Sequence, residues 1–133
     1  MSDEYVLLIH EPDWDPDSMT PDEWREAMSG HQAFQEAVAA AGERVVATSA
    51  LQPIAKATKI TPRADGDPLI TDGPFSETRE VVTGFYSFTA SSPEEARELA
   101  ALVPTGGWVE LYPVLVLDLV PSARVHNLTG NYS

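Results

Sequence analysis

The sequence contains no cysteine among its 133 residues. Disulfides, thiolate nucleophiles and cysteine-ligated zinc are therefore excluded together. No hydrophobic run approaches the roughly 18 residues that a membrane-spanning helix needs. The acidic start, MSDEYVLLIHEPDW, also lacks the basic n-region of a secretory signal. We therefore expect a soluble cytoplasmic protein.

Positive charge is also scarce. The chain has 8 Lys and Arg residues against 21 Asp and Glu residues, which gives a formal net charge of -13. A phosphate backbone would repel such an acidic surface, so direct binding of nucleic acid is disfavoured. Many carboxylates lie near the N-terminus, where the simplest interpretation is a solvated acidic face.

Part of that acidic stretch is similar to the start of a calcium loop. Asp13, Asp15 and Asp17 have the spacing of the first three ligands. Ser18 and Trp24, however, occupy the positions of the required glycine and of the bidentate glutamate. We therefore predict no metal ion here and no other cofactor.

Two helices are marked by closely similar N-terminal signals. The segments TPDE (20–23) and SPEE (92–95) each offer an N-cap hydroxyl, a proline at the first helical position and a glutamate placed for a capping box. The first helix is predicted to run to Ala41, with Gly42 as its stop, and the second to about Leu102.

The remaining segments are rich in β-branched and aromatic residues and predict strands. The order of elements indicates an α+β fold, a ferredoxin-like βαββαβ sandwich with an inserted hairpin. We assign residues 1–118 to a single domain and residues 119–133 to a C-terminal extension. The predicted strands are YVLLIH (5–10), RVVATSAL (44–51), KATKI (56–60), PLIT (68–71), EVVTGFYSFTA (80–90) and WVELYPVLVL (108–117).

The segment EVVTGFYSFTA carries large apolar groups on both faces of the predicted sheet. Val82, Tyr86 and Phe88 share one side. Val81 and Phe85 occupy the other. Helices cover one face only, so we expect the same sheet of a second subunit to cover the other, in a homodimer.

One histidine interrupts the apolar stripe of the first helix. His31 falls within it, so its imidazole is predicted to point at the sheet. It is either a core histidine bonded to a backbone carbonyl or a partly desolvated imidazole that can act as an acid or base. Ser29 and Gly30 before it are poor helix formers, which suggests a requirement other than helix stability. The stripe comprises Trp24, Ala27, Met28, Phe34, Val38 and Ala41.

The segment TDGPFSETRE (71–80) resembles the motif of the DGPF-domain proteins, which belong with the YCII-related family. The resemblance extends to YVLLIHEPDW, AFQEAVAAAGERVVATSALQP, VTGFYSFTASSPEEARELAALVP and VELYPV, and covers roughly residues 4 to 115. The motif residues are Asp72, Gly73, Pro74, Phe75, Glu77, Arg79 and Glu80.

This resemblance implies a dimeric ferredoxin-like α+β barrel with a pocket between sheet and helix. It also implies a His and Asp pair in that pocket, to which His31 and Asp72 correspond. No settled reaction comes with the family, and many relatives are thought to be encoded beside sigma factor genes. A small-molecule ligand and a possible sigma factor association follow as expected partners.

A carboxylate bonded to an imidazole fixes its tautomer and raises its basicity, so the predicted pair of His31 and Asp72 suits proton transfer of the lyase or isomerase type. No Ser or Cys nucleophile with supporting spacing and no Gly-rich phosphate loop is present. Two alternatives stay open. Asp72 can instead bond its own backbone in an Asx turn, and the protein can be a non-catalytic ligand-binding or regulatory module.

Further residues are expected in or near this pocket. His10 ends the first strand and can face either the pocket or solvent. A metal site built from His10, His31 and Asp72 has no supporting ligand spacing, so none is predicted. The other pocket or motif residues are Gly73, Pro74, Phe75, Glu77, Arg79 and Tyr86.

Overall fold

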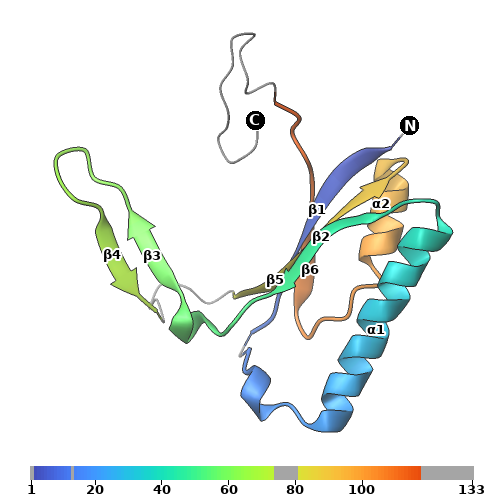
Figure 1. Cartoon of the computed structure of the whole chain (residues 1–133), viewed down its shortest axis with the longest axis horizontal. Coiled ribbons are helices and arrows are strands. Elements are labelled where there is room, and N and C mark those ends of the chain that lie inside the picture. Colours follow the sequence, from blue (N-terminus) through green and yellow to red (C-terminus); the bar gives the residue numbers. More distant parts are fainter. Residues whose placement is uncertain (1, 13, 74–80, 118–133) are drawn as a thin grey trace.

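The computed structural model describes residues 2–12, 14–73 and 81–117 and is drawn in Figure 1. Strands and helices alternate in the order predicted for a βαββαβ core with an inserted hairpin. Two 3-10 turns, Pro16–Ser18 and Ile54–Lys56, accompany them. The elements are β1 (Asp3–His10), α1 (Pro21–Ala40), β2 (Val45–Ala50), β3 (Thr58–Thr61), β4 (Leu69–Asp72), β5 (Val82–Ala90), α2 (Pro93–Ala100) and β6 (Trp108–Pro113).

The main sheet has four strands in the order β2-β5-β1-β6, and all its pairings are antiparallel. In core numbering this is the strand order of the ferredoxin-like fold, so the predicted α+β class is confirmed. Figure 1 shows α1 and α2 together on one side of this sheet. Strands β3 and β4 form a separate two-stranded hairpin.

The predicted capping signals set the helix starts. The Thr20 hydroxyl accepts from the Glu23 backbone N–H at 3.1 Å, and the Glu23 carboxylate accepts from the Thr20 N–H at 2.8 Å. In α2 the Ser92 hydroxyl accepts from the Glu95 N–H. The Glu95 carboxylate, however, accepts from the N–H of Ser91, one residue before the position that a standard capping box uses. Both helix starts are therefore as predicted, with one altered bond.

The core lies between the helices and the covered face of the sheet. Phe34 of α1 is fully buried and packs edge-on against Phe88 of β5, with ring centroids 5.5 Å apart and planes at 87°. Val38 and Leu7 are also fully buried. Burial of such side chains stabilises the fold by about 1.5–3 kcal/mol each relative to exposure, so this cluster fixes α1 on the sheet.

Strand β6 ends earlier than predicted. The expected strand 108–117 stops at Pro113, which pairs with Tyr5 of β1. Because β1 begins at Asp3, almost no partner strand remains beyond that point, and Pro113 has no N–H to donate. Residues 114–117 are exposed and lie outside the sheet.

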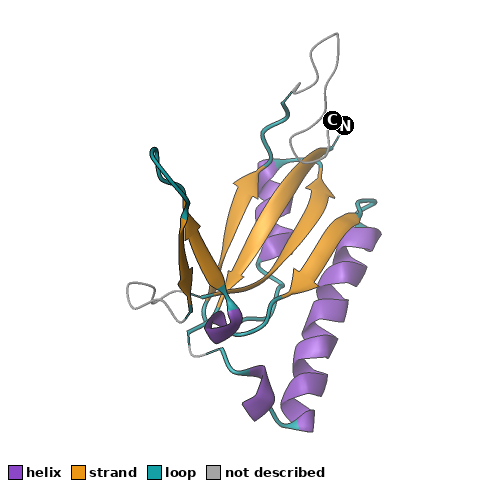
Figure 2. Cartoon of the chain, turned by 60° about the vertical axis from the view of Figure 1, so that its left-hand side comes forward, coloured by secondary structure: helices purple, strands orange, loops and turns teal. Residues whose placement is uncertain are grey.

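The β3–β4 hairpin lies on the side of the main sheet away from the helices, as Figures 1 and 2 show. Ile60 pairs with Ile70, and both side chains are 62% exposed. A two-stranded ribbon with exposed apolar side chains is marginally stable by itself. Among the described residues, no helix is long and apolar enough to cross a membrane.

Candidate functional site

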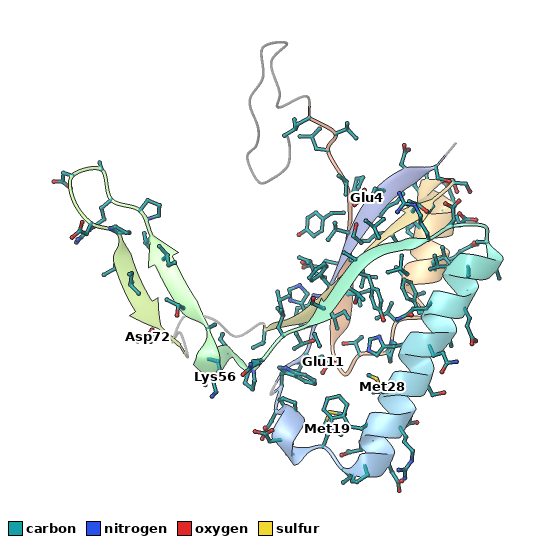
Figure 3. The ribbon with its side chains drawn as sticks, in the orientation of Figure 1. Glu4, Glu11, Met19, Met28, Lys56 and Asp72 are labelled. Carbon is teal, nitrogen blue, oxygen red and sulfur yellow. The ribbon has the colours of Figure 1, made fainter. Side chains whose placement is uncertain are left out.

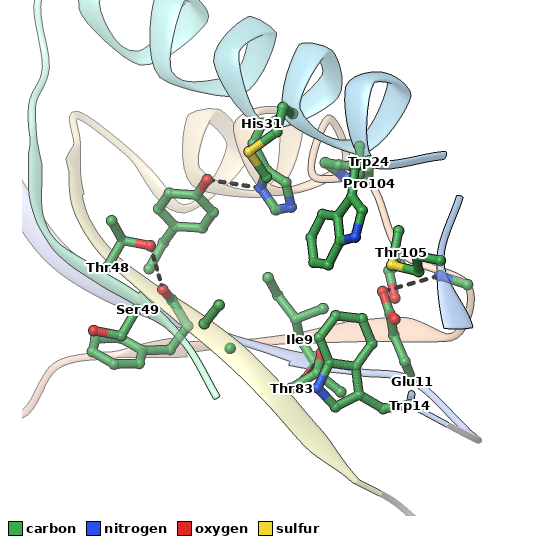
Figure 4. A pocket seen from close by; sticks show the side chains of 18 of the residues that line it. Ile9, Glu11, Trp14, Trp24, His31, Thr48, Ser49, Thr83, Pro104 and Thr105 are labelled. Atoms are coloured by element: carbon green, nitrogen blue, oxygen red, sulfur yellow. Dashed lines mark hydrogen bonds between the residues drawn. The ribbon is translucent and has the colours of Figure 1, made fainter. Parts of the chain in front are cut away.

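A cavity of about 720 Å³ lies between the N-terminal half of α1 and the sheet. Figure 4 shows its walls. Helix α1 contributes Trp24, Met28 and His31, and the sheet contributes Ile9 and Tyr86. The loop that follows β1, the loop that precedes β6 and strand β2 form further walls.

The apolar stripe of α1 divides between core and cavity. Phe34 and Val38, in its C-terminal half, are buried in the core. Trp24 and Met28, earlier in the same stripe, are 36% and 53% exposed and line the cavity instead. His31 lies between the two groups, so its ring is half-buried and borders the cavity.

His31 is held by Tyr86 of β5. The His31 Nδ1 atom lies 2.8 Å from the Tyr86 hydroxyl oxygen. Gln35, one turn along α1, approaches the same hydroxyl at 3.5 Å, the long limit of a hydrogen bond. In Figure 4 the second ring nitrogen of His31 is on the side of the open cavity. One nitrogen is thus anchored and the other is available to a ligand.

The environment of His31 keeps it neutral. Burial lowers the pKa of the imidazole below its ordinary value of 6.5, and the negative charge of Glu11 partly offsets this by raising it. A neutral imidazole has one basic nitrogen. If Nδ1–H donates to Tyr86, then Nε2 faces the cavity as a base. A phenolic oxygen is a weaker acceptor than a carboxylate, so this partner raises the basicity of His31 less than Asp72 would.

Gly30 has a packing reason for its place in the helix. A Cβ atom added at Gly30 would lie 2.9 Å from Cγ of Pro104, which also lines the cavity. A glycine therefore lets α1 approach the loop before β6 closely enough to form the cavity wall. This close contact explains why a poor helix former occupies position 30, as the sequence suggested.

Two cavity residues after β1 were not predicted. Trp14 donates from Nε1 to the Leu51 carbonyl at 3.0 Å, and its ring meets Trp24 edge-on with centroids 6.4 Å apart. Glu11 accepts from the Gly106 N–H at 3.4 Å. The sequence EPDWDPDSM indicates only a polar loop. The one residue in it that could have suggested a site is Trp14, an aromatic side chain among prolines and aspartates.

The structure does not bring Asp72 to His31 within one chain. Asp72 ends β4 in the hairpin, pairs with Thr58 and is exposed. It is not among the residues that line the cavity. Figure 3 labels Asp72 at the hairpin, well apart from Met28 on the cavity side of α1. The hydrogen-bond partner of the His31 imidazole is therefore Tyr86 rather than Asp72.

Gly73 of the motif has a clear structural role. A Cβ atom there would lie 2.1 Å from the Ile54 carbonyl oxygen, a distance that no side chain tolerates. The Gly73 N–H also donates to the Ala57 carbonyl at 2.8 Å. The motif glycine thus allows β4 to end against the turn that precedes β3. Pro74, Phe75, Glu77 and Arg79 lie outside the described residues, as does the extension 119–133.

His10 is buried and does not line the cavity. Its Nε2 atom lies 3.1 Å from a Glu110 carboxylate oxygen, and its ring stacks on Trp108 with centroids 5.0 Å apart. Strand alternation puts these three side chains on the uncovered face of the sheet. Within the described residues, no group of three or more His, Cys, Asp or Glu side chains is arranged to hold a metal ion.

Comparison with known proteins identifies a family. A family model described as the YCII-related domain matches residues 4–118. An uncharacterized protein of Rhizobium meliloti (strain 1021) is 28% identical to this chain over 119 residues, covering 83% of the chain and 90% of that protein. Because the family model matches nearly the whole chain, the protein belongs to the family of YCII-related domains.

Proposed function

We propose that this protein is a small-molecule enzyme in which the neutral imidazole of His31 transfers a proton, in a reaction of the lyase or isomerase type. The observation that carries the proposal is the hydrogen bond of 2.8 Å between Nδ1 and the Tyr86 hydroxyl, at the wall of a cavity of about 720 Å³. A half-buried imidazole anchored at one nitrogen suits general acid–base catalysis.

The proton balance follows from this arrangement. Nε2 of neutral His31 takes a proton from a substrate C–H or O–H, leaving an imidazolium and a substrate anion. The imidazolium keeps its Nδ1–H bond to Tyr86 and returns the Nε2 proton. Return to another substrate atom completes an isomerisation. Transfer to a departing group completes an elimination. Tyr86 is a positioning residue in this scheme, because it acts through His31.

Measurement of proton exchange tests the proposal without a known substrate. The protein is incubated in D₂O with a mixture of small metabolites that carry acidic C–H bonds, and deuterium uptake and product formation are followed by NMR. We expect His31→Gln to reduce any activity by about a hundredfold or more, the range of a lost general base.

The matched control is His10→Gln, since His10 lies outside the cavity. Because His10 lies on the uncovered face of the sheet, the activity of this variant should match the wild type once circular dichroism shows that it is folded and analytical ultracentrifugation shows the wild-type mass. If no metabolite is consumed or exchanged in a His31-dependent way, the protein is a non-catalytic binding module and the proposal is wrong.

A homodimer through the uncovered sheet face is part of the proposal. Supporting it, Trp108 and Tyr112 are 39% and 51% exposed on strand positions of that face. Phe85 occupies the same face on β5. Phe85→Glu should produce monomers in analytical ultracentrifugation. Leu102→Glu, at an exposed position after α2, is the control, and equal masses for both variants would contradict this interface.

Asp72 enters the proposal as a residue supplied by a second copy. It is exposed on a hairpin that lies on the proposed dimer side of the sheet. The mixing of inactive subunits tests this role. The two single variants, His31→Gln and Asp72→Asn, are mixed in equal amounts and their subunits are allowed to exchange. Half of the dimers then contain one subunit of each kind. If Asp72 acts across the dimer, each mixed dimer has one intact site, so the mixture recovers about a quarter of the wild-type activity. Failure of the mixture to recover, with both variants dimeric, removes Asp72 from the mechanism.

A further inference from the structure

The cavity wall carries negative charge and no formal positive charge among its described residues. Its formally charged side chains are Glu11, Glu23 and Glu26, and no Lys or Arg of the described part of the chain lines it. His31 adds no positive charge at neutral pH, because burial lowers its pKa. The excess of carboxylates over basic residues in the whole chain reinforces the local field. These carboxylates would repel an anionic ligand.

The three carboxylates are not equivalent. Glu23 is engaged by the Thr20 N–H in the cap of α1. Glu11 is held over the cavity by the Gly106 N–H, and its charge reaches His31, because it raises the pKa of that imidazole. Of the three, Glu11 is the carboxylate whose charge acts on His31.

Two indole rings form a corner beside Glu11. The rings of Trp14 and Trp24 are nearly perpendicular, at 80°, and belong to different segments of the chain. Trp14 is fixed by its bond to the Leu51 carbonyl. Figure 4 shows both indoles at the cavity, next to Glu11 and Ile9. Indole faces attract cations, and a perpendicular pair surrounds a compact cationic group on two sides.

We propose that the ligand of this cavity is an organic ammonium cation with a compact apolar body, held by the Trp14 and Trp24 rings and by the Glu11 carboxylate. This inference rests on the proposed function for the location of the site, and it adds the class of ligand. The apolar wall from Ile9 and Met28 suits the alkyl groups of such a cation. The neutral base of His31 then faces a substrate whose positive charge makes neighbouring C–H bonds more acidic.

Three probes of almost the same shape test the charge preference. Choline carries a quaternary nitrogen, 3,3-dimethyl-1-butanol replaces that nitrogen by carbon, and 3,3-dimethylbutanoate carries a negative charge. The full-length protein is titrated with each probe, and the three indole N–H signals are followed by NMR. We expect choline to bind about tenfold or more tightly than the alcohol, the scale of one cation–π contact, and the anion to bind most weakly.

The position of binding is read from the same spectra. The signals of Trp14 and Trp24 should move, and that of Trp108, on the other face of the sheet, should not. If the alcohol or the anion binds as tightly as choline, the inference is overturned. Absence of shifts at Trp14 and Trp24 with both choline and benzyltrimethylammonium also overturns it.

Matched variants locate the charge. Glu11→Gln should weaken binding of choline and leave binding of the alcohol unchanged. Glu36→Gln, the same change on α1 outside the cavity, should alter neither. Trp24→Leu should weaken choline more than the alcohol. Equal effects of Glu11→Gln and Glu36→Gln would show that only net charge matters, which contradicts a specific site.

The failures of the two proposals are distinguishable. Cation binding is measured at equilibrium and needs no turnover. Selective binding of choline without any His31-dependent reaction leaves this inference standing and rejects the enzyme. A His31-dependent reaction of a neutral or anionic compound, without preferential binding of choline, supports the enzyme and rejects the inference of a cationic ligand.

Discussion

Replacement of Tyr86 by Phe probes the contact on which the proposed base depends. The substitution removes only the hydroxyl. The ring should keep its contact with Phe34, whose centroid is 4.5 Å away. The Tyr86 hydroxyl lies 2.8 Å from His31 Nδ1, a short hydrogen bond. It lies 3.5 Å from the Gln35 amide nitrogen, the long limit of a hydrogen bond. Tyr86→Phe therefore isolates the bond to His31.

The expected loss of stability is about 1 kcal/mol, the net value of one neutral hydrogen bond. Urea unfolding at pH 7.5 and fixed protein concentration measures it, since an oligomer makes stability depend on concentration. Ser18→Ala is the control. The Ser18 side chain is exposed, and its hydroxyl donates to the Asp15 carbonyl at 2.9 Å, so the loss of stability should stay within about 0.5 kcal/mol.

The direction of the change in the His31 pKa tests the tautomer. If Nδ1–H donates to Tyr86, that bond favours the imidazolium more than the neutral ring, so Tyr86→Phe should lower the pKa of His31 further. NMR titration of the His31 ring protons gives the answer. A pKa that rises would mean that Tyr86 donates to Nδ1, which leaves Nε2 protonated and refutes its role as the base.

Three further outcomes are expected. The free energy of unfolding of the wild type should fall as the pH decreases through about 6.5. In the unfolded chain His31 binds a proton in this range, whereas folded His31, with its lowered pKa, does not. Urea unfolding at a series of pH values should show this loss in the wild type and not in His31→Gln. Gly30→Ala should not give the gain of about 1 kcal/mol expected from helix propensity, because its Cβ would lie 2.9 Å from Pro104; a full gain in urea unfolding would show that α1 and Pro104 are not in close contact. Gly73→Ala should displace the hairpin, since its Cβ would lie 2.1 Å from the Ile54 oxygen; NMR shift changes confined to β3 and β4 would agree, and an unchanged spectrum would not.

Signals from residues close together in the sequence were sufficient to predict the helices and strands, although not every end of them. The caps at Thr20 and Ser92 act within four residues of the chain, so the sequence shows them directly. Gly42, with φ of 79°, follows the last turn of α1 where the stop was predicted. Alternation along β5 put Tyr86 and Phe88 on one side of the sheet, and the structure shows that both are buried in the core. The end of β6 was misjudged, because it depends on where β1 begins, which is a tertiary fact.

The site was only partly predictable, for a similar reason. The helical position of His31 indicated an imidazole aimed at the sheet, but its partner Tyr86 is 55 residues away and was fixed by packing of α1 on β5. Glu11 and Trp14 follow β1 in a loop whose composition indicates only solvent exposure. Residues in a loop follow no helix or strand period, so their sequence does not show which of them contact a helix.

The same helical stripe thus supports two different environments, and the difference has a physical basis. Near Phe34 the sheet lies directly beneath α1, and aromatic rings fill the space. Toward Trp24 the helix passes the cavity, so less packing fixes its first turns. Its position there must depend on the Thr20 cap and on the close contact of Gly30 with Pro104. The Trp14 and Trp24 contact joins the loop to the same helical end. A ligand that fills this corner would add packing contacts to this end of the helix, so binding should raise the stability of the first turns of α1 more than that of the core.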